Sequence, residues 1–232
     1  MSSQDEFYTM MKCPTVGHNG GNPNADLWFC GLEHGGEMEC CKRENKKKLK
    51  MPDRKISFRN NRKGFFNNFY KILEALDLNH SQYPNELFNK DSRFYSANLY
   101  PFGFPGIHFG TNKEIHKLTG LKNKTQYQYL CDLLRKESNE PLLTPNHNRV
   151  IVCFSKSFME DFLVQFVHSD DKLGSAIIQC WEHHANNPDE KYFKVDINSD
   201  TIKAMIFCPH LCARGFKCEN LIELIKSTGW KL

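Results

Sequence analysis

An acid and an imidazole follow an apolar run near the start of the chain, inside a cluster of glycines. The sequence ADLWFCGLEHGGE places Glu33 and His34 between Gly31 and the pair Gly35 and Gly36. Glycine lets the backbone turn tightly and approach a ligand closely. A carboxylate and an imidazole at such a turn are able to transfer protons or polarise water, although a single acid at this place is also typical of a helix cap or a surface position. The segment is therefore a candidate for acid–base chemistry.

A second candidate is an amide beside aromatic side chains. In SANLYPFGFP, Asn98 is followed by Tyr100, Phe102 and Phe104. A side-chain amide offers a hydrogen-bond donor and an acceptor, which suits it to the edge of a nucleobase. Aromatic rings stack on the faces of bases. A lone asparagine here indicates only a turn, whereas the combination with aromatic residues indicates a base-binding surface.

The segment CPHLCARGFKC suggests a third kind of chemistry. Cys208, His210 and Cys212 lie close together in it, and the two cysteines have a spacing found in some zinc sites. However, Cys208 ends an apolar run and no second clean pair of ligands follows. A metal-dependent hydrolase is therefore an alternative, while the leading interpretation expects no metal and no cofactor.

These segments follow apolar runs that have the length and composition of buried parallel strands. Alternation of such strands with helical patterns predicts one α/β domain over residues 1–232, with three layers (α/β/α) around a central four-stranded parallel sheet. Ligands bind at the carboxyl ends of parallel strands, so the candidate residues are expected to meet at that edge. The predicted strands are residues 26–31, 94–100, 149–155 and 202–208, and the predicted helices are residues 65–78, 127–137, 155–167 and 218–229.

The order of the segments resembles the uracil-DNA glycosylase superfamily over about residues 25–228. In that superfamily a Gly-x-Asp/Asn-Pro type motif follows the first strand of a four-stranded parallel sheet, a base-reading Asn follows the second, and a His-Pro-Ser type loop follows the last. CGLEHGGE, ANLYPF and FCPHLCARGF stand in these places here. Glu33 is similar in position to the water-activating residue, and His34 replaces the usual proline. Cys208 replaces the family's histidine, so either His210 has taken over that role or the loop does something else.

The resemblance implies a DNA glycosylase, a hydrolase of N-glycosidic bonds that removes flipped-out uracil or a modified or damaged pyrimidine, as in base-excision repair. Glu33, or Glu37 in its place, would polarise the water and offset positive charge on the sugar. His210 or His34 would stabilise the departing base. A side chain from residues 211–216 would fill the gap left in the duplex. The residues expected to bind the base are Asn98, Tyr100, Phe102 and Phe58.

A strongly basic segment, interpreted as an insertion at about residues 40–63, points to DNA as the partner. Residues 42–63 contain eleven lysines and arginines against two acids, although such a block is also typical of a solvated loop. Cationic side chains at this density attract the phosphates of nucleic acids. The residues expected to contact DNA are Lys46, Lys47, Lys48, Arg59, Arg62, Lys156 and Arg214.

Composition narrows the remaining function classes. The chain is 40% hydrophobic and 25% charged, with a net charge of +4, which is typical of a globular protein. No apolar run reaches the roughly 20 residues that span a membrane, and no secretory signal is evident. We therefore expect no membrane partner and a cytoplasmic location, with the nucleoid if the source is bacterial. The ten cysteines are expected to be reduced thiols in the core. No obligatory protein partner is inferred, and a non-catalytic nucleic-acid-binding protein of the same fold is a further alternative.

Overall fold

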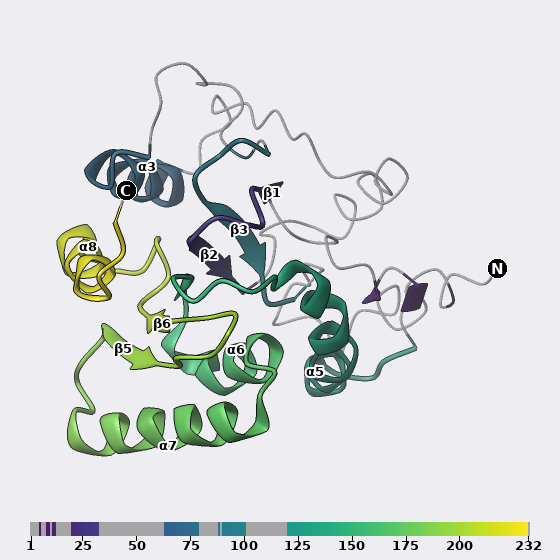
Figure 1. Ribbon diagram of the computed structural model, residues 1–232. Coiled ribbons are helices and arrows are strands. Elements are labelled where there is room, and N and C mark those ends of the chain that lie inside the picture. Colours follow the sequence, from purple (N-terminus) through teal and green to yellow (C-terminus); the bar gives the residue numbers. More distant parts are fainter. Residues whose placement is uncertain are drawn as a thin grey trace.

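The computed structural model describes residues 20–32, 63–78, 90–100 and 120–231, with Phe88 and five isolated positions near the N-terminus (5, 8, 9, 11 and 12). At its centre is a six-stranded mixed sheet with the strand order β1-β3-β2-β4-β6-β5 (Figure 1). The strands are β1 (Gly20–Gly21), β2 (Leu27–Gly31), β3 (Tyr95–Asn98), β4 (Val150–Cys153), β5 (Phe193–Asp196) and β6 (Ala204–Phe207).

The four inner strands run parallel, and each lies within a predicted apolar run. β3 and β4 both pair with β2, and β6 pairs with β4. The expectation of a purely four-stranded parallel sheet was wrong, because β1 and β5 add to its two edges in antiparallel orientation. β1 has only two residues, and β5 is a four-residue strand in which buried and more exposed positions alternate. A two-residue strand and a short alternating strand give little apolar signal in a sequence.

Helices cover both faces of the sheet, so the described part has three layers (Figure 1). Neighbouring residues of a strand point to opposite faces. In β2, Trp28 and Cys30 therefore pack under α5, α6 and α7, whereas Leu27 and Phe29 pack under α3 and α8. No helix in the described ranges is long and apolar enough to cross a membrane. The helices are α3 (Lys63–Ala75), α5 (Lys124–Asn139), α6 (Met159–Phe166), α7 (Asp170–Asn186) and α8 (Cys218–Ser227).

All five helices differ from the sequence prediction in their bounds or in being unpredicted, and α5 and α7 show local reasons for it. α5 begins earlier than predicted, because Asn123 Oδ1 accepts a hydrogen bond from the Gln126 N–H (2.9 Å) and Gln126 Oε1 accepts one from the Lys122 N–H (2.7 Å). These bonds satisfy N–H groups at the start of the helix. α7 was not predicted, since Ala176 and Cys180 are its only buried residues and give a weak helical pattern.

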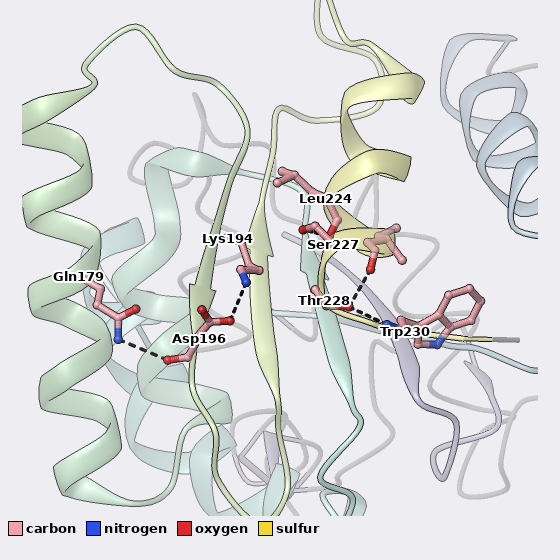
Figure 2. Close-up of polar contacts among 8 residues, drawn as sticks. Gln179, Lys194, Asp196, Leu224, Ser227, Thr228 and Trp230 are labelled. Carbon is pink, nitrogen blue, oxygen red and sulfur yellow. Dashed lines mark hydrogen bonds and ion pairs between the residues drawn. The ribbon is translucent and has the colours of Figure 1, made fainter.

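Short polar contacts hold the edge strand β5 and the end of α8 (Figure 2). Gln179 of α7 donates from Nε2 to the main-chain carbonyl of Asp196 at 3.3 Å. At the other site, Thr228 Oγ1 accepts a hydrogen bond from the Trp230 N–H at 3.2 Å. Gly229 has a positive φ of 74°, so a left-handed glycine follows the C-cap Thr228 and ends α8.

A buried arginine fixes the amino-terminal edge of the parallel strands. Arg149, immediately before β4, is fully buried. Its guanidinium donates to the carbonyls of Thr144 (2.9 Å), Thr201 (3.0 Å) and Pro23 (3.2 Å), and its Cζ lies 4.9 Å from the centroid of the Trp28 ring. Burial lowers the pKa of Arg149 to about 10. This edge is therefore a structural junction.

Candidate functional site

The strand order creates a topological switch point between β2 and β4. From β2 the chain crosses to β3 on one side, and it then returns to β4 on the other side of β2. In open parallel sheets, loops that diverge in this way leave a ligand-binding crevice at the carboxyl ends of the strands. The chain leaves the sheet at this edge after β2, β3 and β6, the strands that precede the candidate segments in the sequence.

Asn98, the last residue of β3, lies across Gly31, the last residue of β2. The two residues are register partners, and a Cβ added to Gly31 would lie 2.7 Å from Asn98 Oδ1. Repulsion at that distance would displace the amide. Asn98 is only 4% exposed. Gly31 therefore provides space for a neighbouring side chain, and packing holds the amide in one position.

β2 and β3 stay hydrogen-bonded one step beyond their last residues. The Leu99 N–H donates to the Gly31 carbonyl (2.8 Å), and the Tyr100 N–H donates to the Leu32 carbonyl (2.7 Å). These bonds fix the backbone as far as Leu32, the residue that precedes Glu33. Glu33 itself lies outside the described residues.

His210 follows the end of β6 and has a defined tautomer. Its Nδ1 accepts a hydrogen bond from the Cys212 N–H at 3.2 Å. A ring nitrogen that accepts a hydrogen bond carries no proton, so the proton of the neutral ring is on Nε2. Although the side chain reaches solvent, partial burial lowers the pKa of His210. The residue is therefore a neutral hydrogen-bond donor near pH 7.

The loop that carries His210 is anchored on both sides of the exposed residues 212–215. Leu211 is fully buried, and its carbonyl accepts a hydrogen bond from Asn68 Nδ2 of α3 at 2.7 Å. At the other end, the Lys217 N–H donates to the Tyr192 hydroxyl. Arg214 lies in the exposed part, where its predicted contact with DNA is sterically accessible and stays a prediction.

Asn98 and His210 leave the sheet from the two outer strands of the parallel group. Two strands, β2 and β4, lie between β3 and β6. With neighbouring strands about 4.8 Å apart, the ends of β3 and β6 are separated by roughly 14 Å. The end of β3 and the end of β6 therefore lie on opposite sides of the ends of β2 and β4. The two side chains would contact a ligand from two sides if it lay across the ends of β2 and β4.

Lys156 lies just after β4 and is held by main-chain oxygens. Its Nζ donates to the carbonyls of Pro188 (3.1 Å) and Glu190 (2.8 Å). These bonds tie the end of β4 to the segment that leads into β5. A phosphate contact by Lys156 stays a prediction, and the structure gives this residue a connecting role as well.

Tyr100 occupies the core instead of an open face. It is fully buried, and its ring packs against Tyr127 and Phe158 with centroid separations of 5.8 and 6.1 Å. Its hydroxyl donates to Asp161 Oδ1 (3.2 Å) and accepts from Gln128 Nε2 (3.2 Å). Stacking of Tyr100 on a base stays a prediction, and it requires this side chain to leave its core position.

The structure has an open groove at the start of α6 that the sequence did not predict. Its volume is about 460 Å³. Trp181 of α7 is 59% exposed, and its Nε1 donates to Glu160 at 2.8 Å. Glu160 and Asp161 lie in the first turn of α6, where acids are common in helices, so their sequence position did not suggest a site. The residues that line the groove are Lys156, Ser157, Met159, Glu160, Asp161 and His184.

Many predicted site residues lie outside the described part of the chain. Their roles stay predictions, as does the interpretation of residues 40–63 as an insertion. These residues are Glu33, His34, Glu37, Phe58, Phe102, Lys46, Lys47, Lys48, Arg59 and Arg62.

The described cysteines are free thiols, and most of them are buried. The thiol of Cys208 donates to the Cys153 carbonyl at 3.6 Å, and burial raises its pKa. Cys212 is exposed instead. Among the described residues, no group of three or more His, Cys, Asp or Glu side chains is arranged to hold a metal ion. This geometry gives no support to a metal site built from Cys208, His210 and Cys212.

Comparison with known proteins leaves the family open. No protein-family model matches the chain, and no curated protein is significantly similar to it.

Proposed function

We propose that the protein is a DNA glycosylase related to the uracil-DNA glycosylase superfamily. It would hydrolyse the N-glycosidic bond of uracil or of a modified or damaged pyrimidine in DNA. The observation that carries the proposal is the amide of Asn98, packed over Gly31 at the carboxyl edge of the sheet and next to the switch point. A side-chain amide carries the donor and acceptor types that match the edge of a base, and one already held by packing loses little further side-chain freedom on binding.

His210 supports the same reaction from the other side of the crevice. A base that leaves an N-glycosidic bond carries negative charge, which a positioned hydrogen-bond donor stabilises. The bond from the Cys212 N–H to Nδ1 leaves Nε2 of the neutral ring as the donor. The anchors at Leu211 and Lys217 limit the movement of the loop that carries this donor.

The water-polarising acid is proposed to be Glu33, with Glu37 as the other candidate. The described backbone ends at Leu32, the residue before Glu33, and it is hydrogen-bonded to β3 beside the switch point between β2 and β4. An ionised carboxylate there would orient water toward the anomeric carbon and offset the positive charge that develops on the sugar. Arg214 and the basic segment would contact the phosphates.

Base release from oligonucleotides tests the proposal. Single- and double-stranded substrates with uracil, hypoxanthine, xanthine and several 5-substituted pyrimidines would be assayed for free base and abasic sites. We expect the native protein to release at least one base, and Asn98→Ala and His210→Asn to slow release by about 100-fold, typical for the loss of one donor to a developing anion. Glu33→Gln should also abolish turnover.

A matched control is His147→Asn, an exposed histidine before β4, at the opposite edge of the sheet. It should leave base release unchanged. Equal rates for His147→Asn and His210→Asn would contradict the role of His210. Binding of DNA without release of any base would favour a non-catalytic nucleic-acid-binding protein of this fold.

A further inference from the structure

An apolar stripe runs along the outward face of α7. The helix contacts α6 and β5 on its inner side and lies at the outside of the described fold (Figure 1). Ala176 and Cys180 are its buried residues. Residues three or four positions apart share one face of a helix, and the face opposite these two is exposed and carries Gly174, Ile178, Trp181 and Ala185. The outward face is therefore apolar, whereas the solvent face of a surface helix is usually polar.

Two large side chains make up most of this α7 stripe. Ile178 is 56% exposed and Trp181 is 59% exposed. The indole is held in place, because its Nε1 donates to Glu160 Oε1 at 2.8 Å. A side chain that is already fixed loses little freedom when a partner covers it, and tryptophan is enriched among the residues that contribute most to binding in interfaces. The α7 stripe therefore has the properties of an interaction surface.

The groove at the start of α6 adjoins the α7 stripe. Glu160, which bonds the Trp181 ring, lines the groove, as does His184, which lies about one turn after Trp181. Met159 adds an apolar side chain to the lining. The volume of about 460 Å³ is in the range of pockets that bind ligands. A partner that covers the α7 stripe would therefore have space to insert a side chain beside it.

The charge around the stripe is negative. Residues 159–190 contain seven acids, one lysine and no arginine, although the net charge of the whole chain is +4. Glu160 is exposed on α6, and three further acids are exposed on α7, namely Asp170, Asp171 and Glu182. This surface therefore attracts cationic groups and repels the phosphates of nucleic acids and of anionic membranes.

The neighbouring lysines compensate these acids only in part. Lys136 Nζ lies 3.9 Å from Asp170 Oδ1, at one end of the stripe. Lys156 lines the groove, but its Nζ already donates to the carbonyls of Pro188 and Glu190. The acids in the middle of the stripe are therefore available to a cationic partner.

We propose that the α7 stripe and the adjoining groove bind an amphipathic basic helix of a partner protein. Apolar side chains of that helix, spaced by three or four residues, would cover Ile178 and Trp181. Its lysines and arginines would face the acids beside the stripe. One of them would enter the groove at Glu160, where an arginine is also able to stack on the Trp181 ring.

A second copy of the chain fits this surface less well. Pairing of two copies through the same stripe would bring the acids of one copy against those of the other, and like charges oppose association. The partner helix is therefore expected to come from another protein. The surface does not depend on the proposed glycosylase reaction.

Selection from a display library of helical peptides tests the proposal. The library would have about five helical turns, with random residues on the outer faces. It would be selected on the native full chain and depleted on Trp181→Ser. We expect the recovered peptides to have a net positive charge and apolar residues at spacings of three and four. Recovery of no peptide, or of peptides with a net negative charge, would overturn the proposal.

Fluorescence anisotropy with one recovered peptide locates its binding site. Ile178→Ser and Trp181→Ser should each weaken binding by at least about tenfold. The matched control is Leu133→Ser, an exposed leucine of α5, which should bind the peptide like the native chain. Glu182→Lys should also weaken binding, whereas Glu74→Lys, an exposed acid of α3 on the other face of the sheet, should not.

Tryptophan fluorescence gives an independent readout. Trp28 is fully buried and Trp230 is partly buried, so added acrylamide quenches mainly Trp181. The peptide should protect this fluorescence in the native chain. The position is wrong if the Ser variants bind as tightly as the native chain. A dimer that forms without peptide and is lost in Trp181→Ser, measured by sedimentation, would assign the stripe to a second copy and overturn the proposed occupant.

Discussion

Replacement of Gly31 by alanine tests the contact on which the base site depends. The new methyl group would lie 2.7 Å from Asn98 Oδ1, whereas ordinary contacts begin near 3.4 Å, so the amide oxygen would have to move by about 0.7 Å. Gly31 has no left-handed φ, so alanine fits its backbone and the steric contact is the main cost. Overpacking of this kind typically destabilises a protein by about 1–3 kcal/mol.

A double-mutant cycle in urea measures this cost directly. In the Asn98→Ala background the methyl group has space, so Gly31→Ala should cost at least about 1 kcal/mol less free energy of unfolding than in the native background. Equal costs in the two backgrounds would refute the contact between residues 31 and 98.

The same substitution should impair base release more than it impairs stability. A displacement approaching 1 Å at a positioning group costs up to about 100-fold in rate, so we expect Gly31→Ala to slow base release by about 10- to 100-fold while the chain stays folded at room temperature. An unchanged rate would contradict the role of Asn98 in holding the base.

Other parts of the fold give further predictions. Arg149→Met should lower the free energy of unfolding by about 3 kcal/mol or more, since it removes the charged donor that bonds the carbonyl oxygens of Thr144, Thr201 and Pro23; a loss below about 1 kcal/mol in urea would contradict this. Folding raises the pKa of Asp132 from 3.8 to about 6, so the folded chain binds this proton more tightly than the unfolded chain. Native stability should therefore fall by about 1–2 kcal/mol from pH 4 to pH 6, allowing for solvent screening. Asp132→Asn should remove this slope in urea unfolding, and an unchanged slope would assign it to other groups. An NMR titration should give His210 a pKa below its ordinary value of 6.5, and a value above 6.5 would contradict its neutral state.

The layered fold was predictable because buried parallel strands have a strong local signature. β2, β3, β4 and β6 are almost entirely buried and lie in largely apolar segments separated by helical patterns, and all of them were located from the sequence. β5 and α7 were not, since β5 alternates buried and more exposed positions and α7 buries only two side chains. Their structure depends on contacts with the rest of the sheet.

The site was predictable only in part, because its geometry depends on register and on contacts between distant segments. Asn98 was singled out by its place after a strand, but its packing over Gly31 follows from the pairing of β2 with β3. Asp132 and Asp161 are on different helices, and nothing local to either residue indicates that Asp161 raises the pKa of Asp132. Tyr100 was expected on an open face, but its burial depends on α5 and α6.

The most direct test of the central claim is base release in a single turnover, with the native protein in excess over the oligonucleotide panel. The account predicts an abasic product from at least one pyrimidine substrate, formed at the native rate by His147→Asn and about 100-fold more slowly by Asn98→Ala. If the native protein forms no abasic product from a panel that it binds, or if Asn98→Ala matches its rate, the claim that Asn98 reads a base for excision is contradicted.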